Sequence, residues 1–347
     1  MVTLQDVAKK ANVSVMTVSR IINNPEKVKD STRINVQKII EELNYHPNFL
    51  AKSLVKGNTK TIGVLYSNIY NQAYLDMITG IDEYAYNKGY SILSTNVDTF
   101  DHGIKALDMI IGNRLEGLIV LPIEMSMSVR EDFDVSIDEI ARFYRYLERT
   151  IEKFNLKCIT LSEKIKGSKN VSFDYRKIAA ISMDYLLERF TNIAMISNVI
   201  MDGLWKEKEE VYLSKMHEKG LQDNVFIVRE QNTVQGGYSA MTKIIESGKK
   251  PQVVYCANDY FAIGAIQSAL AHKLRIPEDI SIMGNDDVQF SKMTFPQITT
   301  VSLNAKEAGR KSVKMLLKLI AGKECEDKMM KHSIVIRGSV GEGASDR

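Results

Sequence analysis

Long apolar runs, paired cysteines and catalytic signatures are all missing from this sequence of 347 residues. No stretch approaches the roughly 18 apolar residues of a membrane span, and the first 30 residues lack the apolar segment of a signal peptide. The three cysteines are odd in number, far apart and without metal-ligand spacing, which argues against a disulfide framework or a zinc site. We therefore expect a cytoplasmic protein with no membrane association, no cofactor and no metal.

The common enzyme motifs are absent as well. There is no Walker phosphate loop, no Gly-x-Ser-x-Gly nucleophile turn and no His-Glu-x-x-His metal motif, and the five histidines are scattered. The closely spaced glycines of GSVGEG at 338–343 do not open a helix after a strand. We expect no catalytic residues. With 44% hydrophobic and 26% charged residues, the composition is that of a globular protein of two or three domains.

Charge is distributed unevenly along the chain. Residues 1–60 hold ten Lys and Arg against five Asp and Glu, a net charge of +5. The remaining residues hold 36 against 38, a net charge of −2, which brings the total to +3. A basic head on a slightly acidic body suggests a module that binds a polyanion, although charge alone fits a solvated surface equally well.

The first sixty residues predict three short helices. Thr3 with Asp6 forms a capping-box-like start, and Asn12 suits the left-handed conformation of a tight turn. Ser14 can cap a second helix, and a third begins at 30–31. The apolar positions at helical spacing are Leu4, Val7, Ala8 and Ala11, then Val15, Val18, Ile21 and Ile22, then Val36, Ile39, Ile40 and Leu43.

Two short helices joined by a tight turn in a basic segment are typical of a helix-turn-helix, whose second helix enters the major groove. Arg20 can donate a bidentate pair to guanine, while Val15 and Met16 can touch apolar features such as the thymine methyl. A three-helix bundle that binds no DNA remains an alternative. The candidates for base edges are Val15, Met16, Thr17, Ser19 and Arg20, and those for phosphates are Thr3, Ser14, Thr17 and Asn23.

VTLQDVAKKANVSVMTVSRIINN, followed by ELNYHPNFLAKSL, resembles the head of the LacI/GalR family of bacterial transcriptional regulators. The resemblance implies that residues 1–60 are a helix-turn-helix DNA-binding domain, in which 48–56 form a hinge helix when a dimer sits on its operator. Leu54 would then wedge between base steps in the minor groove, whereas the alternative is an ordinary apolar linker residue. The residues that match the family's hinge, and are implied in DNA contacts, are Asn48, Ala51 and Leu54, and Lys52 beside them is a further DNA-binding candidate.

From Thr61 onward, apolar strand-like segments alternate with helical ones, such as those at 72–88 and 101–112. This alternation predicts doubly wound parallel sheets, and the length suits two lobes. Ligands of such sheets bind beyond the carboxyl ends of the strands. The predicted strands are TIGVLYS, YSILSTN, GLIVLP, KCITLS, AMISN, VFIVRE, VVYCAN and SIMGND.

The body also resembles that family through YCANDYFAIGAI and SIMGNDDVQFSKMTFPQITTV. The resemblance implies an α/β, periplasmic-binding-protein-like body of two lobes around a cleft: 61–161 plus 292–320, and 162–291 plus 321–341. For Asp259, a ligand contact and a helix cap are equally good interpretations. The cleft residues that the resemblance implies are Asn71, Tyr74, Asn258 and Asp286.

Three cleft positions depart from the family pattern. Lys208 stands where the family commonly has an arginine that forks onto ligand oxygens, and lysine is a point donor rather than a planar fork. Asn232 stands where an aromatic ring often stacks on a sugar, and Ser162 where aspartate is common. We include all three as effector-binding candidates and expect an unusual effector, or none.

The connection at 124–155 is longer than compact α/β proteins need. Its second part, from Ile137 to Phe154, has apolar residues at helical spacing and predicts a longer version of the usual helix of the first lobe. The alternative is a flap over the cleft, formed by 124–136, or a surface for a partner.

Taken together, these features predict a sequence-specific transcriptional regulator, in the first instance a repressor. It would bind a near-palindromic operator in double-stranded DNA as a homodimer, controlled by a small-molecule effector in the interlobe cleft, a sugar or related metabolite. The alternatives are a soluble small-molecule binding protein, which would not need the head and hinge, and a regulator that answers to a protein partner or to no effector.

Overall fold

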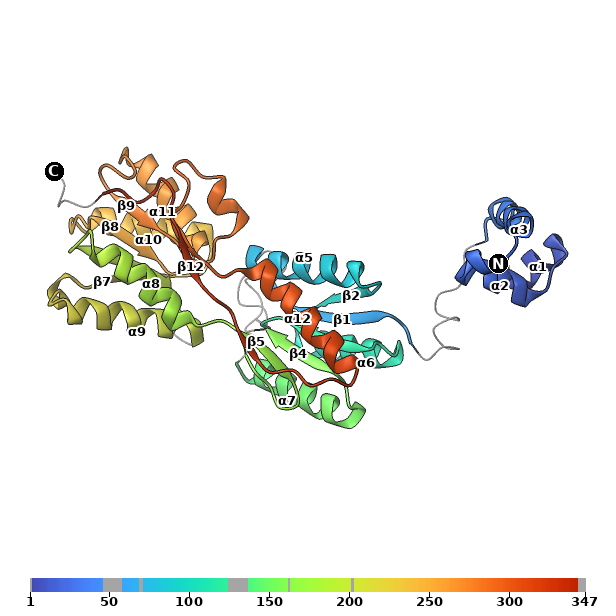
Figure 1. Ribbon diagram of the computed structural model, residues 1–347. Helices are drawn as coiled ribbons and strands as arrows, with labels where there is room; N and C mark the ends of the chain where they lie inside the picture. The colour runs from blue at the N-terminus through green and yellow to red at the C-terminus, as the bar shows by residue number, and fades with distance from the viewer. Residues whose placement is uncertain are drawn as a thin grey trace. The chain divides into compact units, whose positions relative to one another are not determined.

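The computed structural model describes residues 2–45, 58–68, 71–123, 137–161, 163–200 and 203–342. The chain divides into two compact units, a head of residues 1–59 and a body of residues 60–347 (Figure 1). The predicted hinge helix at 48–56 and the candidate flap at 124–136 lie outside the described residues.

The head consists of α1 (Leu4–Ala11), α2 (Val15–Asn23), the short 3-10 turn η1 (Pro25–Lys27) and α3 (Asp30–Glu42). The predicted capping box is present, since the Thr3 hydroxyl accepts the Asp6 N–H and the Asp6 carboxylate accepts the Thr3 N–H at 2.8 Å. Asn12 ends α1 in the left-handed conformation with φ 52°. The buried core of the head consists of Val7, Ala8, Ala11, Val18, Ile21, Val36, Ile39 and Tyr45.

The first lobe of the body is a six-stranded parallel sheet in the order β11-β5-β4-β3-β1-β2. Helices α5 and α12 cover one face, and α6 and α7 cover the other (Figure 1). The elements are β1 (Thr61–Tyr66), α5 (Gln72–Asn87), β2 (Ser91–Asn96), α6 (Phe100–Gly112), β3 (Gly117–Val120), α7 (Ile137–Phe154), β4 (Cys158–Leu161), β5 (Lys169–Ser172), α12 (Ala305–Ile320) and β11 (Lys328–Met329).

Side chains on β1 show why both faces are covered. Ile62 and Val64 belong to the core under α5, while Leu65 points to the core under α6 and α7. Helices α5 and α12 approach closely because glycines lie at their contact. A Cβ atom on Gly309 would come within 2.0 Å of the Met77 carbonyl oxygen, so only glycine fits there.

The second lobe is a four-stranded parallel sheet in the order β7-β6-β8-β9. Helices α8 and α9 pack together, as do α10 and α11, and the two pairs lie on opposite faces of the sheet (Figure 1). The elements are α8 (Tyr175–Leu187), β6 (Ile193–Asn198), α9 (Gly203–Glu218), η2 (Gln222–Asn224), β7 (Phe226–Glu230), α10 (Val234–Glu246), β8 (Val253–Cys256), α11 (Asp259–Ala271), β9 (Ser281–Met283) and η3 (Gln289–Lys292), with the antiparallel pair β10 (Thr300–Ser302) and β12 (Ser333–Val335).

The eight strands predicted from sequence are all present, but the predicted lobe boundaries are displaced. Strand β5 pairs with β4 and β11 pairs with β5, so residues 163–172 and 321–329 belong with the first lobe rather than the second. Residues 292–302 belong with the second lobe, because bridges join Thr299 to Met283 and Ser302 to Asp286. The boundary after β4 could not be predicted because the residues of β5, KNVS, are too few and too polar to show a strand pattern. They form a strand only by pairing with β4.

Three crossovers therefore join the lobes, at 173–174, 303–304 and 330–332. His332, on the third, contacts the first crossover and the last residue of β10, which directly precedes the second. Its Nε2 accepts the N–H of Asp174 at 3.2 Å, and its Nδ1 lies 3.3 Å from the carbonyl oxygen of Ser302. Because Nε2 accepts, the neutral ring carries its proton on Nδ1 and donates it to Ser302.

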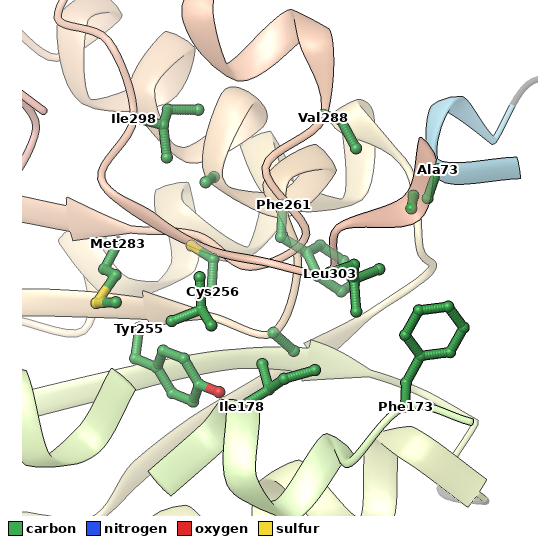
Figure 2. Packing of buried hydrophobic residues seen from close by; sticks show 14 of the residues in the cluster. Ala73, Phe173, Ile178, Tyr255, Cys256, Phe261, Met283, Val288, Ile298 and Leu303 are labelled. Carbon is green, nitrogen blue, oxygen red and sulfur yellow. The ribbon is translucent and has the colours of Figure 1, made fainter. Parts of the chain in front are cut away.

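Buried side chains from the crossovers join the core of the second lobe. Figure 2 shows Phe173 and Leu303, one from each of two crossovers, among residues of that core such as Phe261 and Ile178. The crossovers are thus packed segments rather than loose connections.

The long connection after β3 contains α7, as its apolar spacing predicts. Phe143, Leu147 and Ile151 are buried against α6 and the sheet. Gly103 on α6 makes room for the Phe143 ring, which would lie 2.4 Å from a Cβ atom there. Helix α7 therefore covers the first lobe.

Candidate functional site

The outer face of α2 carries most of the residues predicted to contact base edges. Val18 on the inner face is buried, whereas Val15, Met16 and Arg20 are exposed, and Met16 is 71% exposed. Thr17 and Ser19 are half-buried beside them. Two apolar side chains and a guanidinium thus project from one face of α2 in a basic domain.

Some of the side chains predicted to bind phosphates make hydrogen bonds within the head. The Thr3 hydroxyl donates to the Asp6 carboxylate at 2.7 Å, and the Ser14 hydroxyl caps α2 and lies 2.8 Å from that of Thr17. These groups build the helix starts, and the free N–H groups of a helix start favour an anion. The side chain of Asn23, together with Asn48, Ala51, Lys52 and Leu54, lies outside what the structure describes.

A second candidate site is the cleft between the two lobes of the body. The structure brings six of the seven predicted effector residues together there, all beyond the carboxyl ends of strands, and Ser162 lies outside the described residues. The described lining consists of Asn71, Ala73, Tyr74, Met77, Pro122, Tyr175, Leu204, Trp205, Lys208, Asn232, Asn258, Asp286 and Leu303.

Asparagine side chains of the cleft also hold its walls in place. Asn71 caps α5 by accepting the Ala73 N–H at 3.0 Å, and Asn258 caps α11 by accepting the Phe261 N–H at 3.0 Å. The amide nitrogen of Asn258 donates to the Asn232 oxygen at 2.6 Å. The predicted cleft residues are therefore fixed by local structure before any ligand arrives.

Lys208 interacts with groups of the protein itself, whereas the arginine of the family pattern contacts ligand oxygens. Its ammonium donates to the carbonyl oxygen of Ala257 at 2.6 Å and lies 3.8 Å from Asp286 Oδ1. It also lies over the rings of Tyr175 and Trp205, at 5.7 and 5.9 Å from their centres. Burial lowers the pKa of Lys208, and the Asp286 charge opposes that shift.

The structure bears out neither interpretation of Asp259, which does not line the cleft and does not cap α11. Asp259 is fully buried, accepts the Val288 N–H at 2.9 Å and the Thr300 hydroxyl at 2.7 Å, and is not among the cleft-lining residues. Burial raises its pKa well above the usual range, with the Asp286 charge adding to the effect. It ties β10 and the turn after β9 to α11, while the cap itself is Asn258.

Sequence reasoning missed the aromatic walls Tyr175 and Trp205. Trp205 is the single tryptophan of the chain and follows β6 closely, which was a usable signal. Tyr175 begins α8 directly after a crossover that the sequence did not reveal.

One hydrogen bond connects the lobes beside the cleft. The Gln72 N–H at the start of α5 donates to the Tyr260 hydroxyl on α11 at 2.9 Å. The Tyr260 hydroxyl oxygen accepts this bond, and burial raises the pKa of Tyr260. A change in the distance between α5 and α11 would break the bond.

Other site types find little support in the described parts of the chain. A larger hollow between α7 and α12 lies at the amino ends of β4 and β5, the edge of the sheet that ligands rarely use. Among the described residues, no group of three or more His, Cys, Asp or Glu could hold a metal ion. Nor is any described helix both long and apolar enough to cross a bilayer.

Comparison with known proteins matches both units. Residues 3–48 match the model of the bacterial regulatory proteins of the lacI family, and residues 183–340 match a periplasmic binding protein-like domain. The chain is 31% identical to the HTH-type transcriptional repressor PurR of Pasteurella multocida, covering 98% of this chain and 99% of the relative. It is 30% identical to catabolite control protein A of Priestia megaterium, covering 97% and 99%.

Solved structures agree on the fold. A lac repressor dimer bound to operator and the anti-inducer ONPF superposes with a TM-score of 0.78, at 23% identity, covering 97% of this chain and 98% of that one. The predicted fold class is thus confirmed. The chain belongs to the LacI family of bacterial regulatory proteins and is a DNA-binding transcriptional regulator with a periplasmic-binding-protein-like body.

Proposed function

We propose that this regulator is a repressor that binds a near-palindromic operator as a homodimer and that a small molecule in the interlobe cleft controls its affinity. The observation that carries the proposal is the outer face of α2, where Val15, Met16 and Arg20 stand exposed on a capped helix. Two such helices on one duplex would read half-sites about one helical turn apart or slightly more. The solved lac repressor relative is described as a dimer on its operator.

An exposed apolar patch on the second lobe supports dimer formation. Phe290 lies in η3, Met293 and Phe295 follow it, and Phe295 is 90% exposed. Exposed aromatic groups of this kind are typical of protein interfaces. We assign this patch to the contact with a second copy, and Phe295→Glu should lower the dimer fraction in sedimentation velocity.

Control by a ligand follows from the position of the cleft. Both lobes line it, and the first lobe begins with β1, directly after the head along the chain. A ligand that alters the spacing of α5 and α11 would change how the first lobes of a dimer present residues 48–56 to the operator. Because coupling between two sites is reciprocal, operator binding would alter effector affinity by the same factor.

We propose further that the protein catalyses no reaction and acts in the cytoplasm, at the nucleoid. The family resemblance and the absence of enzyme motifs from the sequence support this proposal. Chemical turnover of a bound ligand would contradict it.

Selection of duplexes from a random pool, followed by a salt titration of the selected operator, tests the core of the proposal. We expect a sequence preference and an affinity that falls steeply with salt concentration, since phosphate neutralisation releases counterions. Arg20→Ala should relax the preference at one base step. A pool that yields no preferred sequence would reject the proposal.

A further inference from the structure

Three residues at the amino edge of the first-lobe sheet are bonded to one another. Lys60, Tyr90 and Glu116 each stand directly before a strand, namely β1, β2 and β3. Because β1 lies between the other two strands, the chain enters the sheet with Tyr90 on one side and Glu116 on the other. Lys60 is also the first residue of the body, directly after the head along the chain. We call these three residues the strand-start cluster.

The cluster is organised around one carboxylate. Glu116 accepts the backbone N–H of Lys60 at 2.6 Å through Oε1 and the hydroxyl of Tyr90 at 2.9 Å through Oε2. The Lys60 ammonium donates to the same hydroxyl at 3.2 Å and lies 4.4 Å from the centre of the Tyr90 ring. Hydrogen bonds to a carboxylate are stronger than those between neutral groups, so Glu116 is the main anchor of the cluster.

These bonds fix the direction of the backbone at Lys60. Its N–H is held by Glu116, and its carbonyl oxygen accepts the Ser91 N–H at 2.8 Å. Since peptide units are planar, holding both groups fixes the two planes that meet at the Lys60 Cα atom, and with them the path of the chain before β1. Lys60 has φ 49°, a left-handed conformation that lysine adopts rarely and keeps where its surroundings hold it.

Building on the proposed binding of an operator by a dimer, we propose that Glu116 and Tyr90 are positioning residues that set the half-site spacing. They hold Lys60 in the conformation that directs the chain from the first lobe toward the head. Without the Glu116 bond, rotation about the Lys60 backbone would redirect the preceding residues while β1 stays in the sheet. The two heads of a dimer would then reach half-sites at several spacings.

The same bond would also matter for control by a ligand. A ligand that displaces the first lobe moves β1, and the displacement is passed along the chain toward the head only if the backbone at Lys60 does not rotate instead. The strand-start cluster would thus couple the body to the operator while contacting neither the ligand nor the bases.

Half-site spacing gives a test that reports on direction rather than on stability. Two inverted copies of the half-site recovered by selection from a random pool are placed with their centres about 8 to about 14 base pairs apart, on either side of one helical turn. Each added base pair turns one half-site by about 35° relative to the other. The full-length protein is titrated with each duplex and with a duplex that carries a single half-site.

We expect the unmodified protein to bind its preferred spacing at least about 10-fold more tightly than spacings that differ by one or two base pairs, because linked modules lose avidity when their geometry does not match the span. Glu116→Ala should reduce this preference to within about 3-fold and leave the affinity for a single half-site unchanged. Tyr90→Phe, which keeps the ring beside the ammonium, should have a smaller effect in the same direction. Glu116→Gln keeps an oxygen that accepts the Lys60 N–H and should restore most of the preference.

Glu83→Ala is the matched control. Glu83 is also a first-lobe carboxylate with a lysine partner, Lys306, at 2.7 Å, but it lies on α5 and joins that helix to α12. Its removal should leave the spacing preference unchanged. A general loss of stability would weaken all duplexes in proportion, so the ratio of affinities between spacings separates a positioning role from a structural one.

A second measurement needs no DNA. Hydrogen exchange of the Lys60 amide, read from overlapping peptides that contain it, should be at least about 10-fold faster in Glu116→Ala than in the unmodified protein, because the bond to the carboxylate protects it. Glu83→Ala should exchange at the unmodified rate. Equal rates in Glu116→Ala and Glu83→Ala would show that Glu116 does not hold the backbone, and the positioning role would be refuted.

The outcomes separate this inference from the proposed function. A protein that prefers one spacing and keeps that preference in Glu116→Ala retains the proposed function and refutes the positioning role alone. The same holds if the unmodified protein selects a half-site but binds all spacings equally. A protein that selects no duplex rejects the proposed function, and the positioning role falls with it.

Discussion

Truncation of Met16 tests whether the exposed face of α2 reads bases. Fully burying a methionine side chain contributes about 1.5–3 kcal/mol. Since Met16 is 71% exposed, its coverage by DNA would contribute about 1–2 kcal/mol. Met16→Ala should therefore raise the Kd for the selected operator about 5- to 30-fold.

Fluorescence anisotropy with a labelled operator, measured over a range of salt concentrations, gives the Kd and its salt dependence. The slope of log K against log salt should be unchanged, because the substitution removes no contact between a cation and a phosphate. Affinity for unrelated duplexes should also be unchanged. The melting temperature should stay the same, since an exposed side chain contributes little to the folded head.

Ile34 provides a matched control. It is also aliphatic and 64% exposed, but it lies on α3 rather than α2. Ile34→Ala should leave operator affinity within about 2-fold of the unmodified protein, as most exposed substitutions do. If Ile34→Ala weakens binding as much as Met16→Ala, or if Met16→Ala weakens all duplexes equally, the assignment of α2 as the reading helix is wrong.

Three further predictions concern the body. Tyr212→Phe removes a buried hydroxyl that donates to a β6 carbonyl at 2.7 Å and accepts a β7 N–H at 3.2 Å, so urea unfolding should show a loss of about 2–4 kcal/mol. Gly309→Ala forces α5 and α12 apart and should cost about 1–3 kcal/mol or more, whereas Gly112→Ala, whose added Cβ atom meets no neighbour, should be neutral or slightly stabilising. Burial lowers the pKa of His332 below 6.5 in the folded state, so its contribution to the free energy of unfolding is complete above pH 6.5 and declines as pH falls toward the folded pKa. His332→Gln should flatten this part of the stability profile as pH falls below 6.5, and an unchanged slope would contradict the buried neutral ring that accepts the Asp174 N–H.

Many elements of the fold could be predicted from residues that are close together in the sequence. The capping box of Thr3 and Asp6 and the left-handed turn at Asn12 depend on side chains within three residues of the backbone groups that they bind. For the same reason, the strands with continuous apolar runs could be located from sequence, and so could α7. Motif positions then placed Asn71 and Asn258 at the cleft edge, where both are also helix caps.

The lobe boundaries could not be predicted in the same way. Strands β5 and β11 are short, polar and defined by their neighbours in the sheet, so their own residues carry no strand pattern. The aromatic wall at Tyr175 depends on the crossover that follows β5, and it was missed with that crossover.

The sequence by itself determined the kind of protein: a basic helix-turn-helix head, alternating strands and helices in the body, and polar residues at the ends of the strands. Each of these three features can be predicted from a short continuous segment of sequence. Hydrogen bonds within a helix turn and the periodicity of apolar residues both depend on residues only a few positions apart. Tertiary structure alone decided what the charged groups do. Lys208 on α9 and Asp286 after β9 are far apart in the chain, and only the folded second lobe brings the ammonium within 3.8 Å of the carboxylate. His332 likewise contacts Asp174 and Ser302 only once three distant segments have come together.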